Sequence, residues 1–298
     1  MFTIVHWMII IVFSMEFGIK INTMKIIKFK TIGSDPEFAI RKDNINLPSY
    51  MFIDSKKGSP KEYESGFGIM KDNLLIEGNI PPASNASGFI SNMKLLKGLI
   101  ETIIRKSGSV LISEDIVSYN KEFIETEDGQ EFGCSSYVDA WSITVKKSPE
   151  LFNTNKRPIG GHIHIGYEII DEKYNQETIN PALARAFDYF LSLPADTVKF
   201  CKERRETYGA LGSFRDTEYG FEYRSLGGYF MKDEHLKWVY DQSLKAIDFI
   251  SKEENIEKIM SIKKPSYDHY DFLGIDLNEQ VPIINNNEIL KKIKQILA

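Results

Sequence analysis

The chain is poor in cysteine. Only Cys134 and Cys201 occur among 298 residues, and no CxxC motif is present. A disulfide framework needs a longer series of about four or more cysteines, and a cysteine zinc site needs closely spaced pairs. We therefore expect neither of them, and a reducing compartment is the simplest interpretation.

An excess of positive charge is also absent. The formal net charge is −5 and the sequence pI is about 5.7, which argues against a broad nucleic-acid-binding surface. A local basic site for an anion stays compatible with this balance. The 42% hydrophobic residues, with 12% aromatic, are typical of a globular protein with enough apolar material for a core.

No apolar run is long enough to cross a bilayer. The most apolar stretch, MFTIVHWMIIIVF, falls short of the roughly 20 residues required, and it lacks the basic start and the cleavage site of a signal peptide. MKIIKFK, from Met24, resembles a natural protein start. We interpret residues 1–23 as an apolar extension from a mis-assigned start codon, with an extra strand or a membrane-associating segment as alternatives. No stable membrane association is expected.

The remaining chain, residues 24–298, contains no internal repeat, low-complexity tract or long Pro/Ser-rich linker, so we predict a single domain. Strand patterns cover 26–40 (interrupted at Gly33), 72–83, 157–169 and 219–228. Helical patterns cover 89–106, 180–200 (starting at Asn180-Pro181 and kinked at Pro194), 233–252 and 285–298. Strands in blocks between long helices predict an α+β fold, with a largely antiparallel sheet and helices on one face.

Several of these strand segments carry polar residues where a buried sheet should be apolar. In GGHIHIGY, His162 and His164 are two residues apart, so in a strand they share a face, with Ile163 and Ile165 on the other. The same spacing relates Asp35 to Glu37 and Glu222 to Arg224, while Asp72 and Glu77 flank a fourth strand. Crowded carboxylates repel unless a cation neutralises them. Mg²⁺ and Mn²⁺ prefer such oxygen ligands, with an occasional imidazole.

Arginines are concentrated between Lys202 and Gly228, in a segment rich in Gly and Tyr. The planar guanidinium suits phosphate and carboxylate groups. Each feature alone has an ordinary alternative, such as a solvated turn, a structural histidine pair, a surface ion pair or a charged loop. The indication of function comes from their recurrence on strand-like segments flanked by glycine.

The order of these motifs resembles the phage-associated carboxylate–amine ligase family, type 2, whose members are related to glutamine synthetase and glutamate–cysteine ligase. The motifs are G-x-D-P-E, D-x4-E-x-N-x-P-P, G-G-H-I-H-I-G and R-x3-Y-G-x2-G-x2-R-x6-E-Y-R, within roughly residues 24–245. The resemblance implies an antiparallel sheet curved around a funnel-like active site, with ATP and Mg²⁺ or Mn²⁺ on its concave face and helices on the outer face.

The resemblance also implies roles for single residues. The metal-binding residues would be Asp35, Glu37, Glu77, His162 and Glu222, with Asp72 as a neighbour. His164 would lie on the nucleotide side, and phosphate or substrate carboxylate would be held by Arg204, Arg215 and Arg224. Position 35 is Asp where the related strand has Glu, so its reach is shorter. The catalytic residues would be Glu222, Arg224 and Arg215.

The implied reaction is ATP-dependent: a carboxylate attacks the γ-phosphate to give an acyl phosphate, and an amine then displaces phosphate to form an amide or peptide bond. The partners would be a small-molecule or peptide carboxylate and an amine, in the cytoplasm of a bacterium or a phage-infected host, and an oligomer is compatible with this. Two alternatives stay open. The same residues suit a divalent-metal hydrolase that needs no ATP, and an inactive ligase fold would serve as a binding protein.

Overall fold

The computed structural model describes residues 25–55, 58–63, 66–130, 136–147 and 154–265. The predicted extension over residues 1–23 and the predicted helix over residues 285–298 lie outside these ranges. The single domain predicted from residue 24 onward stays a prediction.

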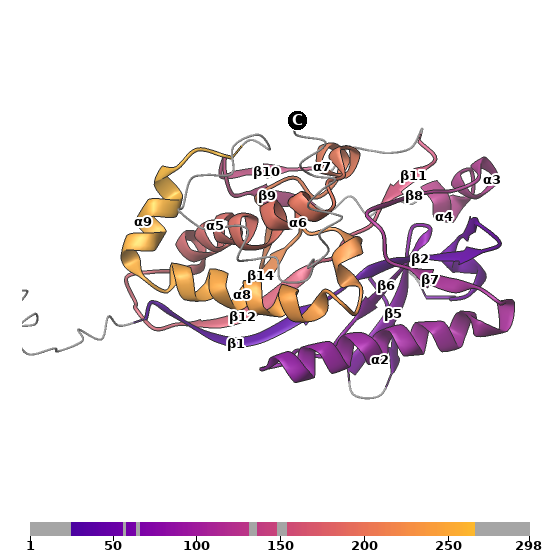
Figure 1. The fold of residues 1–298 in the computed structure, drawn as a ribbon, viewed down its shortest axis with the longest axis horizontal. Coiled ribbons are helices and arrows are strands. Elements are labelled where there is room, and N and C mark those ends of the chain that lie inside the picture. Colours follow the sequence, from indigo (N-terminus) through magenta and orange to yellow (C-terminus); the bar gives the residue numbers. More distant parts are fainter. Residues whose placement is uncertain (1–24, 56–57, 64–65, 131–135, 148–153, 266–298) are drawn as a thin grey trace, which may run out of the picture.

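The described chain is α+β, with two larger antiparallel sheets and a two-stranded one, where the sequence analysis expected one curved sheet (Figure 1). The first sheet has the order β1 (Ile27–Ser34), β12 (Ile163–Ile169), β14 (Gly220–Tyr223), β13 (Ser213–Thr217), β9 (Tyr137–Asp139) and β10 (Thr144–Lys146). The second has β3 (Ile45–Leu47), β2 (Glu37–Lys42), β6 (Leu75–Asn79), β5 (Phe67–Asp72) and β4 (Lys61–Tyr63), with β7 (Val110–Ile112) also on β2. The small sheet pairs β11 (Lys156–Pro158) with β8 (Ile116–Ser118).

Helices pack on these sheets and on one another. The α-helices are α2 (Ala86–Ile104), α3 (Lys121–Ile124), α4 (Glu127–Gln130), α5 (Gln176–Phe187), α6 (Leu193–Val198), α7 (Lys202–Thr207), α8 (Leu236–Ile250) and α9 (Glu253–Ser261). Short 3-10 turns occur at η1 (Ser49–Met51), η3 (Arg105–Ser107) and η5 (Gly228–Met231), and a π-helical turn at η4 (Asp188–Ser192).

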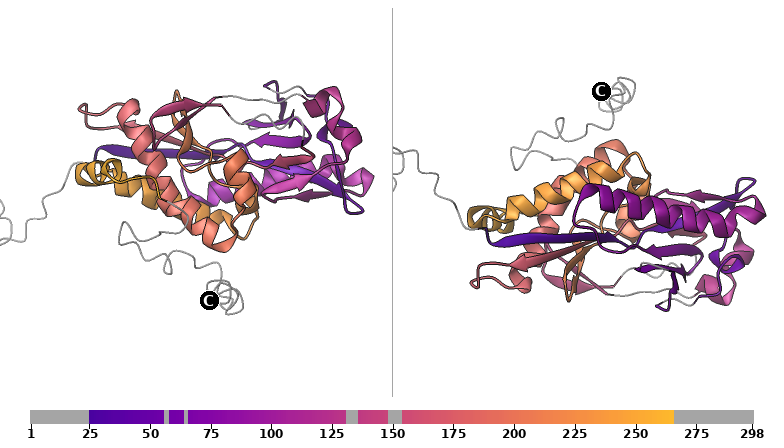
Figure 2. Two further views of the ribbon diagram at one scale, coloured as in Figure 1. Left: turned by 90° about the horizontal axis from the view of Figure 1, so that it is seen from above. Right: turned by 90° about the horizontal axis from the view of Figure 1, so that it is seen from below.

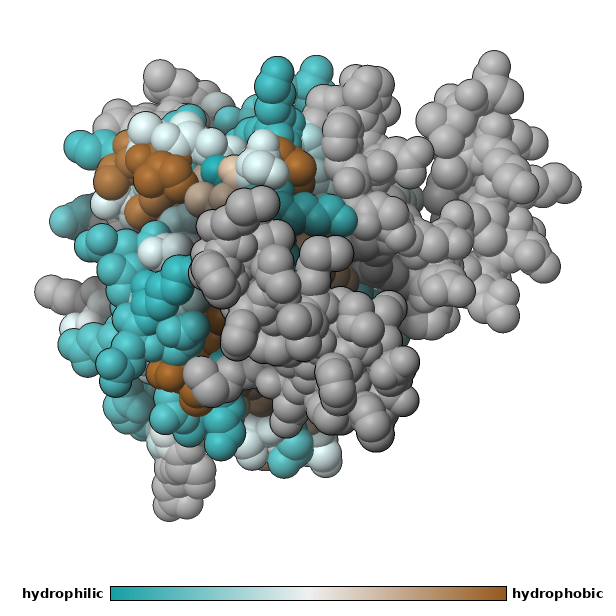
Figure 3. All heavy atoms as spheres, turned by 90° about the vertical axis from the view of Figure 1, so that its left-hand side faces the viewer, coloured by the Kyte–Doolittle hydropathy of each residue, from teal (hydrophilic) through white to brown (hydrophobic). Residues whose placement is uncertain are grey.

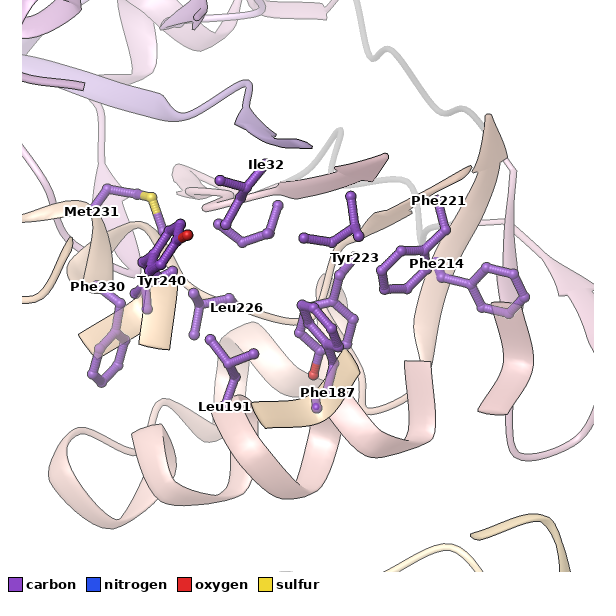
Figure 4. Close-up of a cluster of buried hydrophobic side chains, with 14 of the residues drawn as sticks. Ile32, Phe187, Leu191, Phe214, Phe221, Tyr223, Leu226, Phe230, Met231 and Tyr240 are labelled. Atoms are coloured by element: carbon purple, nitrogen blue, oxygen red, sulfur yellow. The ribbon is translucent and has the colours of Figure 1, made fainter. Parts of the chain in front are cut away.

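The helical face of the first sheet is apolar because β14 alternates. Phe221 and Tyr223 are both fully buried. The ring of Phe187, from α5, lies 5.2 Å from the ring of Phe221 and 5.1 Å from that of Tyr223 (Figure 4). Since successive strand side chains point to opposite faces, Glu222 points away from this core. Packing of the helices on one face thus leaves the polar row of the sheet for a site.

Helix α2 agrees with its sequence pattern. Asn85 caps it by accepting a hydrogen bond from the Gly88 amide at 2.9 Å, so the helix begins three residues before the predicted start at Phe89. Met93 and Leu96, three positions apart on one face of the helix, are completely buried. The helix crosses the second sheet in the view from below (Figure 2, right).

The predicted start of the helix over 180–200 is wrong. The helix begins at Gln176, because Asn175 accepts from the Thr178 amide at 3.0 Å. Asn180 instead lies inside α5, where its buried amide accepts from the Tyr167 hydroxyl and donates to Asp216. The predicted interruption near Pro194 is present as the π-helical turn η4. A proline has no amide hydrogen for the regular helical ladder, which accounts for irregular backbone just before it.

Two predicted strand runs are divided differently. The first continues through Gly33 and ends at Ser34, so its break falls at Asp35-Pro36 and not at Gly33. The run over 157–169 divides at the paired glycines into β11 and β12. The first break has the larger consequence. Because β1 belongs to one large sheet and β2 to the other, Asp35 and Pro36 lie where the two sheets meet.

On the side shown in Figure 3, the described residues are mainly hydrophilic, and the hydrophobic ones form small separate patches. Among the helices of the described chain, none combines the length and apolar character needed to cross a bilayer.

Candidate active site

A first group of potential ligands lies on the polar face of the first sheet. Antiparallel pairing sets His164 of β12 opposite Glu222 of β14, and Glu222 opposite Arg215 of β13. Directly opposed side chains share a face. Asp35, just beyond the end of β1, places its Oδ1 2.8 Å from His164 Nε2. Ligand atoms of Asp35, His164 and Glu222 all lie within 4.8 Å of one another.

A second group lies on the second sheet. Glu37 of β2 is opposite Glu77 of β6, and Asp72 ends the neighbouring strand β5. Ligand atoms of these three carboxylates also lie within 4.8 Å of one another, although Glu37 is only 3% exposed and Glu77 only 7%. Three carboxylates held this close together suit a bound cation, which would offset their mutual repulsion.

His162 and Tyr208 connect the two groups. His162 Nδ1 lies 3.3 Å from Asp35 Oδ1 and 3.7 Å from Glu222 Oε1, in the first group. Its Nε2 lies 2.8 Å from the Tyr208 hydroxyl. That hydroxyl in turn lies 3.3 Å from Glu37 Oε1, in the second group. The two groups are therefore neighbours within one site at the meeting of the sheets.

The first group is a network of opposite charges. Burial opposes ionisation of Asp35, but the imidazoles of His164 and His162 hold the pKa of its carboxyl well below the usual range. Burial likewise disfavours a charged imidazole, yet Asp35 and Glu222 raise the pKa of His164. A divalent cation entering this group would offset the negative charge of Asp35 and Glu222 directly.

Two arginines lie beside Glu222. Arg224 forms a close ion pair with Glu222, and its Nη2 donates to the Tyr208 hydroxyl at 2.8 Å. Burial disfavours its charge, but Tyr208 and Glu222 raise the pKa of Arg224, so it stays protonated. Arg215 Nη1 lies 3.6 Å from Glu222 Oε2, with 28% of its side chain exposed. Both cations are therefore placed where an anion approaching the first group would meet them.

Arg204 has a different environment from the one that the resemblance implied. It is only 2% exposed, and its guanidinium donates to three backbone carbonyl oxygens. These are Ile159 O at 2.9 Å, Ser225 O at 2.7 Å and Leu226 O at 2.6 Å. Phosphate binding would require these bonds to break inside the protein, so we leave Arg204 out of the phosphate-binding set. Its bonds fix the loops that precede β12 and follow β14.

Gly160, the first of the paired glycines, lies directly against Glu37 and His162. Its amide donates to Glu37 Oε2 at 2.6 Å, and its carbonyl oxygen accepts from the Glu37 amide at 3.0 Å. A Cβ atom at this position would lie 2.4 Å from His162 Nε2, so a side chain there would displace the imidazole. The absence of a side chain at Gly160 therefore allows neighbouring chain segments to approach closely.

The donor set fits hard divalent cations. Carboxylate oxygens with one or two imidazole nitrogens are the ligands that Mg²⁺ and Mn²⁺ take. His162 Nδ1 is buried and forms no hydrogen bond of regular geometry in the described chain, but it faces Asp35 Oδ1 at 3.3 Å and Glu222 Oε1 at 3.7 Å, so a cation could bind between the three groups.

The structure brings most of the predicted residues together, at places that differ in detail from the expectation. The predicted ligands in or between the two groups are Asp35, Glu37, Glu77, His162 and Glu222. Asp35 and Glu37, predicted to share a face, belong to different groups because Pro36 separates the two sheets. His164, predicted on the nucleotide side, lies in the first group, and Asp72 lies in the second.

Sequence reasoning missed Tyr208. The residue was present in the R-x3-Y-G motif, four positions after Arg204 and directly before Gly209. A tyrosine carries no formal charge, so composition gave it no prominence. Its fixed place in that motif was the available signal.

Comparison with known proteins supports the resemblance over part of the chain. Residues 152–263 match the family model described as phage phiEco32-like COOH.NH2 ligase-type 2. This segment contains the histidine strand, the arginine-rich segment and β14. No curated protein matches the sequence.

Proposed function

We propose, from the ligase-family match over residues 152–263 and the two acidic groups at the meeting of the sheets, that this protein is an ATP-dependent carboxylate–amine ligase. The observation that carries the proposal is the proximity of these groups, with His162 between them and two arginines beside Glu222. The two antiparallel sheets would form the walls of a glutamine synthetase-like funnel, with ATP across the groups.

The two groups would divide the work of holding Mg²⁺ or Mn²⁺. Asp35, Glu222 and the histidines would bind one ion, and Glu37, Asp72 and Glu77 another. When bound, such ions neutralise phosphate oxygens and offset the charge that develops during phosphoryl transfer. The departures from the implied ligand set are the inclusion of His164, which lies with Asp35 and Glu222, and of Asp72, which lies with Glu37 and Glu77.

The proposed reaction begins with attack of a substrate carboxylate oxygen on the γ-phosphorus of ATP, which forms an acyl phosphate and releases ADP. The amine nitrogen then attacks the acyl carbon and phosphate leaves, so an amide bond replaces the acyl–oxygen bond. Arg215, the more exposed of the two arginines, would contact the transferred phosphoryl group. Arg224, held by its ion pair with Glu222 and its hydrogen bond to Tyr208, would stabilise the same phosphoryl group without changing position.

The arginines favour a ligase over the metal-dependent hydrolase that the sequence also allowed. A hydrolase needs a metal ion and water, whereas two guanidinium groups beside one metal-binding carboxylate suit a phosphate-bearing substrate. The proposed substrates are a small-molecule or peptide carboxylate and an amine. A cytoplasmic site of action and a possible oligomer stay predictions.

The test is calorimetric binding of ATP to the full chain with and without Mg²⁺, for wild type, Glu37→Gln and Glu222→Gln. We expect metal-dependent binding that Glu37→Gln weakens strongly, and turnover reduced by orders of magnitude in Glu222→Gln. The matched control is Glu168→Gln, since Glu168 lies on β12 but is half-exposed and paired with Lys30.

Once binding is established, ADP release is followed while carboxylate and amine pairs are varied. No binding at millimolar ATP in folded protein would refute the proposal, as would a near-normal rate in Glu222→Gln. Metal-dependent ester or amide hydrolysis without ATP would instead support the hydrolase.

A further inference from the structure

The Tyr208 hydroxyl is held at the centre of the site by local backbone geometry. Tyr208 follows α7, and its amide donates to Arg204 O at 2.6 Å. The next residue, Gly209, has a φ of +73°, and a Cβ there would lie 2.5 Å from the Arg204 guanidinium. Glycine is therefore required for the turn that follows the tyrosine. The Tyr208 ring lies against the ring of His162, with 5.9 Å between centroids.

The Tyr208 hydroxyl has three polar neighbours, Arg224, Glu37 and His162, which differ in whether they donate or accept a hydrogen bond. It has one proton to donate and lone pairs to accept with. Arg224 can only donate to it, at 2.8 Å, and the Glu37 carboxylate can only accept from it, at 3.3 Å.

The remaining contact is with His162 Nε2 at 2.8 Å. In an arrangement that satisfies all three contacts, the hydroxyl proton goes to Glu37 and the tyrosine oxygen accepts from His162 Nε2, which then carries the imidazole proton. In a neutral ring the other nitrogen, Nδ1, keeps its lone pair. This is the nitrogen that is buried, forms no hydrogen bond of regular geometry in the described chain and faces Asp35 and Glu222.

We propose that Tyr208 is a positioning residue that holds His162 in the Nε2-protonated form and thereby presents Nδ1 as a ligand to a divalent cation in the first group. The proposal rests on the metal sites of the proposed function. It adds that the Tyr208 hydroxyl, which touches neither metal nor substrate in this role, sets the proton position on His162 through its hydrogen bond to Nε2. Such outer hydrogen-bond partners of metal-bound histidines typically change metal affinity 10- to 100-fold.

The first measurement is the nitrogen NMR spectrum of the histidine side chains in metal-free protein, since protonated and lone-pair ring nitrogens resonate far apart. The His162 signals are assigned by their loss in His162→Gln. In wild type, the neutral ring should show a protonated Nε2 and a lone-pair Nδ1. In Tyr208→Phe, the Nδ1-protonated form should rise. A neutral wild-type ring protonated at Nδ1 would overturn the proposal without any variant or any metal.

The second measurement is calorimetric titration of Mn²⁺ into wild type, Tyr208→Phe and Tyr167→Phe. Tyr167 is the matched control, since its hydroxyl is bound to Asn180 on the helical side of the sheet. We expect about 10- to 100-fold weaker Mn²⁺ binding in Tyr208→Phe and unchanged affinity in Tyr167→Phe. Unchanged affinity in folded Tyr208→Phe would refute the positioning role.

The two measurements also separate this proposal from the proposed function. If wild type binds no Mn²⁺, the metal sites and the purpose assigned to Tyr208 both fail, whatever the tautomer. If wild type binds Mn²⁺ and ATP but Tyr208→Phe leaves the tautomer and the affinity unchanged, the ligase proposal survives and the role of Tyr208 does not.

Discussion

Asp188 should make the stability of the protein fall as pH rises through the mildly acidic range. Its side chain is fully buried and accepts from Trp141 Nε1 at 2.6 Å, the Gly212 amide at 3.0 Å and the Tyr223 hydroxyl at 2.6 Å. Burial raises the pKa of Asp188 from 3.8 to about 6, even though these donors favour the charged form.

The sign follows from proton counting. Between the ordinary pKa and the raised one, the folded state binds a proton that the unfolded state has released, so stability decreases with rising pH. The contribution is complete below about pH 4 and lost above about pH 6. A shift of about two units, at about 1.4 kcal/mol each, gives about 3 kcal/mol. Asp188→Asn cannot titrate, so it should gain about 3 kcal/mol relative to wild type between about pH 4 and about pH 7.

The assay is urea unfolding of both proteins across that range, followed by tryptophan fluorescence and circular dichroism. The variant can be less stable at every pH, because its amide replaces an acceptor oxygen by a donor, but that cost does not change with pH. Asp248→Asn, which alters an aspartate with 66% of its side chain exposed, should change stability by less than about 1 kcal/mol throughout. A difference between Asp188→Asn and wild type that stays constant with pH would refute the reasoning.

Three further substitutions test the packing beneath and beside the site. Gly160→Ala should displace His162, lowering Mn²⁺ affinity in calorimetry and costing about 1–3 kcal/mol in urea unfolding; unchanged values for both would contradict the close contact. Arg205→Met should cost about 3–5 kcal/mol, measured by thermal and urea unfolding, because it leaves the buried carboxylate of Asp196 without its ion pair; a loss below 1 kcal/mol would speak against it. Phe187→Ala should cost about 3–5 kcal/mol in the same assay, since the ring is completely buried; a small loss would show that the core collapses around the cavity.

Local patterns in the sequence were sufficient for much of the secondary structure. The apolar spacing of α2 predicted both a helix and its buried face, because 3.6-residue periodicity depends only on the helix itself. The alternation of Ile163 and Ile165 predicted a buried strand face, and both are completely buried. Helix starts were less secure, since Asn175 and Asn180 are the same residue type and only the fold distinguishes the cap from the buried amide.

The candidate ligands, whose metal-binding role stays a prediction, were readable as acids and histidines that recur on strand-like segments flanked by glycine. Their grouping was not. Period-two spacing places Asp35 and Glu37 on one face only if the strand continues. Pro36 ends that continuity, and the two carboxylates lie with partners from separate sheets.

The sequence by itself determined which residue types could hold a cation, which strand faces were apolar and which family the motif order resembles, since all of these depend on residues close in the chain. Only the tertiary structure decided that Glu77 faces Glu37, that Arg204 binds backbone carbonyls and that Tyr208 lies against His162. The reason is physical. Strand pairing and buried hydrogen bonds join segments far apart in sequence, and those partners are selected by the packing of the whole core.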